Sequence, residues 1–258
     1  MPSRPVVLVT GAARRIGRAI ALDLAAHGFD IALHCHAASA ESAATLAELR
    51  GRGARAEVFA ADLADEAATR DLLPAVAQAF GRVDALVNNA SRFAYDDAAS
   101  FGHAEMQAHW RINTAAPILL AQALHAHLVA RDAQGCVVNL LDQKLANPNP
   151  DYLSYTLSKA ALQSATVMLA QALAPRLRVC GVAPGVTMIS GDMSEADFAA
   201  AHRLTPLRRS STPADIAQAV RYLIEAPAVT GTTLLVDGGQ HLVAQPRDVA
   251  FLVQPSGT

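Results

Sequence analysis

The sequence predicts one α/β domain with a doubly wound parallel sheet of about seven strands, a Rossmann-type architecture. Short aliphatic segments alternate with longer, alanine-rich amphipathic segments along the 258 residues. Strands that alternate with helices of ten or more residues form a parallel sheet through right-handed crossovers, with helices on both faces. Val6–Val9 is continuously apolar, as a strand buried on both faces should be. No repeat, low-complexity tract or linker divides the chain, so residues 1–258 are interpreted as a single domain.

The individual elements follow from these segments in order. Strands are expected at Val6–Val9, Ile31–His34, Ala56–Phe59, Ala85–Val87, Val137–Leu141, Val179–Val182 and Thr233–Val236. Helices are expected at Ile16–Ala26, Glu41–Arg50, Glu66–Phe80 and Leu153–Leu173. Gly28 and Gly81 follow two of these helices and are typical stop residues. A further helix should begin at Thr212, a capping residue followed by Pro213 in the first helical position and by Asp215.

Two segments do not fit the alternation. Pro184–Arg209 is too long and too mixed for a simple connection, so a lid-like loop is expected at about residues 186–210. The C-terminal tail, residues 240–258, contains an apolar patch at Val249–Val253 for which the sequence suggests no role.

Composition and charge exclude several classes of partner. Hydrophobic residues make up 52% of the chain and charged residues 17%, which is enough apolar material for one large core. The formal net charge is −2 and basic residues are scattered, so neither nucleic acid nor a membrane surface is an expected partner. The longest apolar run, Ala115–Ala130, is interrupted by polar residues, and no signal peptide is recognisable. A soluble, cytoplasmic protein with reduced, buried cysteines is expected.

A glycine-containing turn lies between the first strand and the first helix. It reads Thr10-Gly11-Ala12-Ala13-Arg14-Arg15-Ile16-Gly17. Glycines in this place let a pyrophosphate approach the main-chain N–H groups at the positive end of a helix. A tight strand–helix turn would explain both glycines without a ligand. The position of the turn in an alternating chain nevertheless favours a dinucleotide site.

The same turn resembles the Thr-Gly-x3-Gly-x-Gly fingerprint of the short-chain dehydrogenase/reductase family, with Arg15 in place of the middle glycine. Further segments resemble family motifs in the same order: Asp62-Leu63, Asn88-Asn89-Ala90, Asn113, Tyr155-x3-Lys159, Pro184-Gly185 and Asp237-Gly238-Gly239. Together they extend over nearly the whole chain. The resemblance implies a nicotinamide-dependent oxidoreductase, with a homotetramer as the typical assembly.

The end of the second strand indicates which nicotinamide cofactor is used. An NAD enzyme places an acidic residue there to hold the ribose hydroxyls, whereas this chain has no carboxylate before Glu41. Arg15, helped by His36 and Ser39, is expected to meet the 2′-phosphate of NADPH. No third ligand accompanies His34 and His36, so no metal site is expected. The residues expected to bind NADPH are Gly11, Arg14, Arg15, Ile16, Gly17, His36, Ser39, Asp62, Leu63, Asn89, Ala90, Tyr155, Lys159, Pro184, Gly185 and Thr187.

Tyr155 and Lys159 are the expected centre of the chemistry. Four residues apart on one predicted helix, they share a face and can act together. A tyrosine has an ordinary pKa of about 10, which suits neither an acid nor a base at neutral pH, and a neighbouring ammonium group is expected to lower that pKa. The family resemblance implies that Lys159 also bonds the nicotinamide ribose and that Asn113 helps to hold a proton-relay water.

Asp142 lies thirteen residues before Tyr155, where the family usually has a serine that polarises the substrate carbonyl. A carboxylate cannot donate to a carbonyl oxygen unless it is protonated, but it can accept from an N–H group of a nitrogen heterocycle. Pteridine reductases carry an aspartate at this place. The chain also resembles them at Thr10–Arg15, Leu33–His36 and Asn89–Phe93.

The resemblance to pteridine reductases implies a substrate site. Phe93 is expected to stack on a flat pterin, with Ser91 and Asp142 at the edges of the ring. Thr187 lies where those enzymes have a serine beside the cofactor. Their arginine after the second strand histidine is Ala37 here, which removes part of the expected grip on the 2′-phosphate.

The leading hypothesis is an NADPH-dependent reductase of a pteridine such as dihydrobiopterin or dihydrofolate. Its catalytic residues would be Tyr155, Lys159, Asp142 and Asn113, and its substrate-binding residues Ser91, Phe93, Asp142 and Tyr155. A carbonyl or 3-oxoacyl reductase is the alternative enzyme, which Asp142 disfavours unless its carboxyl is protonated. A non-catalytic NADPH-binding sensor is a third hypothesis. It is disfavoured because the catalytic residues Asn113, Tyr155 and Lys159 are all present.

Overall fold

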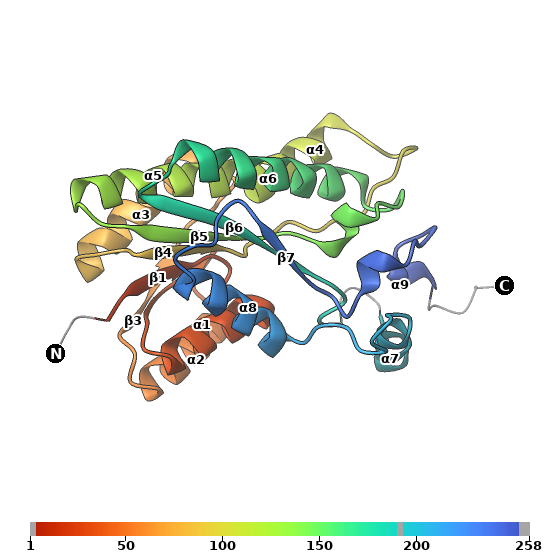
Figure 1. Ribbon diagram of the computed structural model, residues 1–258, viewed down its shortest axis with the longest axis horizontal. Coiled ribbons are helices and arrows are strands. Elements are labelled where there is room, and N and C mark those ends of the chain that lie inside the picture. Colours follow the sequence, from red (N-terminus) through yellow and green to blue (C-terminus); the bar gives the residue numbers. More distant parts are fainter. Residues whose placement is uncertain (1–3, 190–192, 253–258) are drawn as a thin grey trace.

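The computed structural model describes residues 4–189 and 193–252 as one seven-stranded parallel sheet with helices on both faces (Figure 1). The strand order is β3-β2-β1-β4-β5-β6-β7. The strands are β1 (Val6–Val9), β2 (Asp30–Cys35), β3 (Ala56–Ala60), β4 (Ala85–Asn88), β5 (Gly135–Leu140), β6 (Leu177–Pro184) and β7 (Thr233–Val236). The predicted fold class is confirmed. The direction of winding reverses between β1 and β4, which is where doubly wound sheets bind their ligands.

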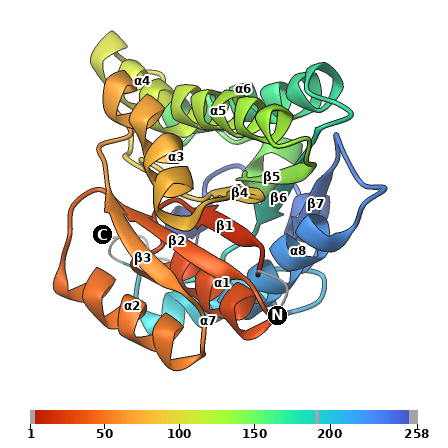
Figure 2. The same cartoon turned by 90° about the vertical axis from the view of Figure 1, so that its left-hand side faces the viewer.

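Two layers of helices sandwich the sheet (Figures 1 and 2). One layer contains α1 (Arg15–Ala26), α2 (Ala40–Gly51) and α8 (Pro213–Glu225), and the other contains α3 (Glu66–Phe80), α4 (His103–Trp110), α5 (Ala116–Ala130) and α6 (Leu153–Ala172). Alternate side chains of β1 therefore enter different cores: Val7 and Val9 pack in one core, and Val6 and Leu8 in the other.

The capping signals read from the sequence define the ends of several helices. The Thr212 side chain accepts a hydrogen bond from the Asp215 N–H, and the Asp215 carboxylate accepts one from the Thr212 N–H, as in a capping box. Gly81 ends α3 with φ = +79°, a left-handed conformation that glycine adopts without steric cost. The predicted helix Glu66–Phe80 and the predicted strands Val6–Val9 and Thr233–Val236 have the bounds that the structure shows, and the other predicted elements differ by one or two residues at one or both ends.

One long helical segment was not predicted. Helix α4, a π-helical turn at Arg111–Ala115 and helix α5 run on continuously from His103 to Ala130. This segment is long and apolar enough to pass a length-and-hydropathy test for a membrane span, but 44% of the tested window is buried inside the protein. A core helix of a folded domain passes the same test, so the match is weak support for a span. Here α5 packs against α3 and β4.

The segment expected to be a lid-like loop at residues 186–210 contains a helix. Ser194 begins α7 (Glu195–Arg203) through a capping box with Asp197. Residues 190–192 of the same segment lie outside the described residues. Helix α7 lies next to α9 (Val249–Leu252), formed by most of the apolar patch of the tail, whose Val253 also lies outside the described residues (Figure 1).

Candidate active site

Two cavities open at the carboxyl ends of the parallel strands, where the loops after β1, β2, β4, β5 and β6 meet. One cavity, of about 650 Å³, is lined by the turn after β1 and by the ends of β2 and β3. The other, of about 620 Å³, is lined by the loops after β5 and β6 and by the C-terminal tail. Arg14, Arg15, Ile16, Asn89 and Ser91 line both cavities, so the two form one continuous site.

The turn after β1 has the backbone of a phosphate-binding loop. Gly11 has φ = +63°, and a Cβ atom there would lie 3.0 Å from the Cα atom of Ala90. A Cβ atom on Gly17 would overlap the carbonyl oxygen of Gly11. Arg15 occupies the place of the middle glycine of the fingerprint with φ = +53°, which explains why glycine is favoured in that position. The cradle is shaped by the absence of side chains and fits a dinucleotide pyrophosphate.

The segment that follows β4 braces this turn. The Asn89 amide group donates to the carbonyl oxygens of Thr10 (2.9 Å) and Gly11 (3.1 Å). In return, the Thr10 hydroxyl oxygen accepts from the main-chain N–H groups of Asn89 (2.9 Å) and Ala90 (3.0 Å). Asn89 and Ala90, both predicted to bind the cofactor, thus lie in the cavity and also fix the shape of the cradle.

His34 is a second brace that sequence reasoning did not assign to the cofactor site. Its Nδ1 accepts from the Gly11 N–H at 3.2 Å, and its Nε2 lies 3.0 Å from the carbonyl oxygen of Ala61. The ring is 2% exposed, and burial lowers the pKa of His34, so the neutral ring is favoured. The His-x-His pattern at the end of β2 was the available signal.

Three basic side chains line the cavity at the corner expected to hold the 2′-phosphate, and each has a different partner. Arg14 lies 3.9 Å from Glu41, and His36 lies 3.6 Å from Asp62, both in exposed pairs. Arg15 instead reaches across the site and donates to the carbonyl oxygen of Ile189 at 2.9 Å. Arg14 and His36 are therefore as well placed as Arg15 to meet a phosphate at this corner.

Ser39, the remaining residue predicted for this corner, already has a structural task. Its hydroxyl accepts from the Ser42 N–H at 3.2 Å as the N-cap of α2. Leu63 and Asp62 line the same cavity.

Within residues 4–189 and 193–252, no three His, Cys, Asp or Glu side chains gather into a potential metal site.

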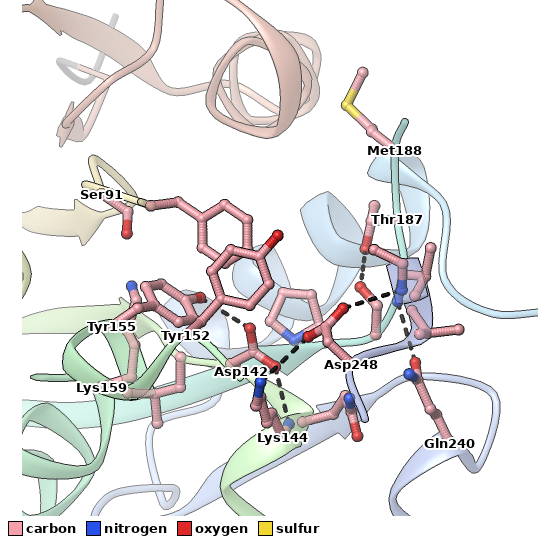
Figure 3. Close-up of a pocket in the computed structure, with 18 of the residues that line it drawn as sticks. Ser91, Asp142, Lys144, Tyr152, Tyr155, Lys159, Thr187, Met188, Gln240 and Asp248 are labelled. Carbon is pink, nitrogen blue, oxygen red and sulfur yellow. Dashed lines mark hydrogen bonds and ion pairs between the residues drawn. The ribbon is translucent and has the colours of Figure 1, made fainter. Parts of the chain in front are cut away.

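Tyr155, Lys159 and Asp142 meet in the second cavity, as predicted (Figure 3). Tyr155 and Lys159 come from the first two turns of α6, and Asp142 follows β5. The Tyr155 hydroxyl donates to Asp142 Oδ2 at 2.8 Å. The Lys159 ammonium group donates to the carbonyl oxygen of Leu140 at 2.7 Å and lies 5.8 Å from the centre of the Tyr155 ring.

The electrostatics of this group differ from the prediction made for Tyr155. Burial and the neighbouring Asp142 raise the pKa of Tyr155 well above its ordinary value, and no contact between the lysine ammonium group and the phenol oxygen opposes them. The expectation that Lys159 lowers the pKa of Tyr155 is therefore wrong. Burial lowers the pKa of Lys159 itself to about 8, although Asp142 opposes this effect.

Asp142 has an unusual environment for a carboxyl group. Burial raises its pKa, while the hydrogen bonds from the Lys144 N–H and the Tyr155 hydroxyl act in the opposite direction. The raised pKa favours a proton on the carboxyl group to higher pH than usual. Asp142 and Tyr155 together form a hydrogen-bonded pair of acids that can pass one proton along.

The side chain of Asn113, expected to help hold a proton-relay water, makes its hydrogen bonds to protein groups. Its amide nitrogen donates to Ser158 Oγ and to the carbonyl oxygen of Arg92, both at 3.0 Å. Its amide oxygen accepts from the Arg92 N–H at 2.8 Å and from Ser91 Oγ at 3.2 Å. All donor and acceptor positions of the amide are thus occupied. Asn113 braces the segment that carries Ser91 and Phe93.

Aromatic side chains form one wall of the second cavity. The ring of Phe93 stacks on Tyr152 with 4.3 Å between centroids and 18° between planes, and it meets Tyr155 edge-on at 4.7 Å. Phe93 is 49% exposed, so a face remains open to a ligand. Pro184, Gly185 and Thr187 line the same cavity.

Known proteins match this chain over nearly its whole length. A sequence model described as enoyl-(acyl carrier protein) reductase matches residues 11–241. Pteridine reductase 1 of Leishmania tarentolae is 32% identical over 283 aligned positions, covering 93% of this chain and 98% of that protein. The chain belongs to the short-chain dehydrogenase/reductase family. It is an oxidoreductase of that family, as the sequence predicted.

Relatives of this short-chain reductase differ in their substrates. The structure of alternative dihydrofolate reductase 1 (FolM) from Brucella canis, complexed with NADP, has a TM-score of 0.90 and 40% identity, covering 96% of this chain and 98% of that one. A 3-oxoacyl-[acyl-carrier-protein] reductase of Synechocystis is 32% identical, covering 91% of this chain and 96% of that protein.

Several residues of this short-chain reductase site escaped the sequence reasoning. Tyr152 supports Phe93, and its φ of +57° sets it at the start of α6. Lys144, Arg247 and Asp248 also line the second cavity. Arg247 and Asp248 come from the tail, about a hundred residues from Lys144 along the chain, so no local spacing could reveal the contact.

Proposed function

We propose that this short-chain reductase is an NADPH-dependent reductase of pteridines of the dihydrobiopterin or dihydrofolate kind. The observation that carries the proposal is the Tyr155–Asp142 hydrogen bond of 2.8 Å beside the exposed face of Phe93. It places an acid pair next to a flat apolar surface, which suits a planar ring that must receive a proton on nitrogen. The Brucella dihydrofolate reductase and the Leishmania pteridine reductase support this substrate class.

The residues present can carry the proton side of such a reduction. NADPH, when bound, supplies the hydride. Tyr155 gives its proton to the reduced ring, and the proton of Asp142 passes to the phenolate oxygen along their hydrogen bond. Asp142 then recovers a proton from water in the open cavity. Lys159, charged below a pKa of about 8, would bond the nicotinamide ribose, as the resemblance to the family implies.

The alternative substrate class keeps a specific observation in its favour. Because the pKa of Asp142 is raised, a protonated carboxyl group can donate to a carbonyl oxygen, as the family serine does. The Synechocystis relative is a 3-oxoacyl reductase. A 3-oxoacyl ester is therefore the competing substrate that any assay must include.

A steady-state assay of NADPH oxidation with dihydrobiopterin, dihydrofolate and a 3-oxoacyl ester tests the proposal. Turnover of a dihydropterin is expected, with a KM that rises in Phe93→Ala because stacking is lost. Phe101→Ala is a matched control, because Phe101 is also exposed but lies outside both cavities. If every pterin is inert while the 3-oxoacyl ester is reduced briskly, the pteridine assignment fails and the oxidoreductase assignment remains.

NADPH is expected to bind more tightly than NADH. Arg14, Arg15 and His36 line the cavity that contains the corner expected to hold the 2′-phosphate, and Glu41 there is paired with Arg14. Arg15→Ala should lower the NADPH-over-NADH preference by about tenfold or more, the effect of losing one hydrogen bond to a charged group. Fluorescence titration of both nucleotides measures the preference.

A second arginine on the same helix provides the control. Arg18 pairs with Glu48 on the surface and lines neither cavity, so Arg18→Ala removes the same charge without touching the phosphate corner. Its NADPH preference should equal that of the natural protein. Equal affinities of the natural protein for NADPH and NADH would contradict the cofactor assignment.

A further inference from the structure

The C-terminal tail is bound firmly against the substrate side of the site. The Arg247 Nε–H donates to both carboxylate oxygens of Asp151, at 2.9 and 2.8 Å, and Arg247 Nη2 lies 2.7 Å from Oδ1. The Asp248 N–H donates to Asp151 Oδ2 at 2.7 Å. Asp151 is only 2% exposed, so this anchor is largely shielded from water. Phe251 adds ring contacts with Tyr95 (5.5 Å) and Tyr152 (6.2 Å).

Lys144 connects this anchored tail to Asp142. Its main-chain N–H donates to Asp142 Oδ1 at 2.9 Å, while its ammonium group donates to the carbonyl oxygen of Asp151 at 2.6 Å and to Asp248 Oδ2 at 3.2 Å. Lys144 is 4% exposed, and lysine is rarely buried to this extent. The proton transfer proposed above does not involve it. Asp142 and Asp248 both line the cavity, and each accepts a hydrogen bond from Lys144 (Figure 3).

We propose that Asp248 belongs to the active site: Lys144 holds its carboxylate beside the Tyr155–Asp142 pair, and the two carboxyl groups together determine where the proton of that pair resides. Asp248 is a positioning residue that acts through Asp142. This deepens the proposed function and rests on its assignment of Asp142 to proton delivery. The apolar patch of the tail serves this arrangement, because Phe251 holds the segment that carries Asp248 against the aromatic wall.

The charges around Asp142 predict the direction in which its pKa should move when one of them is removed. Tyr155 and Lys159 face it from α6, Lys144 from the loop after β5, and Asp248 from the tail. The negative charge of Asp248 raises the pKa of Asp142, and Lys159 lowers it. Removing the charge of Asp248 should therefore lower the pH at which Asp142 loses its proton. Removing the charge of Lys144 leaves Asp248 uncompensated, so it should raise that pH.

Carbon-13 NMR of the protein labelled on aspartate carboxyl carbons, without cofactor or substrate, tests these signs. The Asp142 signal is assigned with Asp142→Asn. We expect Asp248→Asn to move its titration midpoint down by at least about half a pH unit and Lys144→Met to move it up, as loss of one charge in a largely buried cluster should do. The alkaline limb of the turnover profile should move in the same directions with whichever substrate is reduced.

Two further variants separate this effect from damage to the fold. Lys144→Arg keeps the charge and should keep the midpoint, and Asp23→Asn removes a carboxylate of α1 that pairs with Arg221 far from both cavities, so it should shift nothing. An unchanged midpoint in Asp248→Asn, or shifts of the same sign in Asp248→Asn and Lys144→Met, would overturn the proposal. Because the titration needs no substrate, its result is independent of whether pterins are reduced.

Discussion

Replacing Tyr155 with phenylalanine should lower turnover by at least about a hundredfold while NADPH binding is retained. The hydroxyl is the hydrogen-bonded partner of Asp142, and the ring itself is 7% exposed and packs edge-on against Phe93. Phenylalanine fills nearly the same volume, so the cavity should keep its shape while the proton donor is lost. Steady-state kinetics measure turnover, and fluorescence titration measures NADPH binding.

Tyr152→Phe is the matched control for this change. It removes a hydroxyl from a neighbouring ring that stacks on Phe93. Unlike the Tyr155 hydroxyl, the Tyr152 hydroxyl makes no hydrogen bond to Asp142. Turnover in that variant should stay within a few-fold of the natural protein. A Tyr155→Phe protein with near-normal turnover would show that another group delivers the proton.

Replacing Asp142 with serine should change the substrate class. With a pterin, the ring loses a proton source and its own N–H loses an acceptor, a cost of about 1–3 kcal/mol or roughly five- to 150-fold in kcat/KM. With a 3-oxoacyl ester, serine restores the donor that the family usually has, so that activity should hold or rise. The ratio of the two kcat/KM values, measured in one preparation, reports the switch.

Asp142→Asn separates charge and proton supply from shape. It keeps the volume of the side chain and can still accept from the Tyr155 hydroxyl, but it carries no acidic proton. Pterin turnover should therefore fall in this variant too, without any gain toward the oxoacyl ester. If Asp142→Ser reduces pterins at the natural rate, the role assigned to Asp142 is wrong.

Much of the fold could be predicted because its signals are local. Val6–Val9 is apolar throughout, and Thr212, Pro213 and Asp215 form a capping sequence, so both elements appear where expected. The long helix from His103 to Ala130 was missed, because its middle is apolar on most sides and shows no amphipathic stripe. The segment packs against α3, α6 and the sheet, so apolar residues on several of its sides are buried.

The candidate site was predictable to the extent that its residues follow strands. Asp142, Asn89 and Pro184 are at or just beyond the carboxyl ends of β5, β4 and β6, and parallel strands bring those ends to one edge. The tail contacts of Lys144 and Asp248 depend on tertiary packing alone. The pKa of Tyr155 was predicted in the wrong direction because sequence spacing shows the lysine but not the burial that outweighs it.

The π-helical turn at Arg111–Ala115 has a consequence for the thermodynamics of this protein. A π-turn fits one more residue into a turn than an α-helix does and is the less stable of the two forms. Here Asn113 lies in the middle of the turn and donates hydrogen bonds to both Ser158 and Arg92. Deleting one residue from the turn would give a more regular helix but rotate the amide away from both partners. A regular helix here should raise the stability of the protein but lose the hydrogen bonds that hold the Phe93 segment in place. Variants selected for heat resistance that stay active should therefore keep this turn.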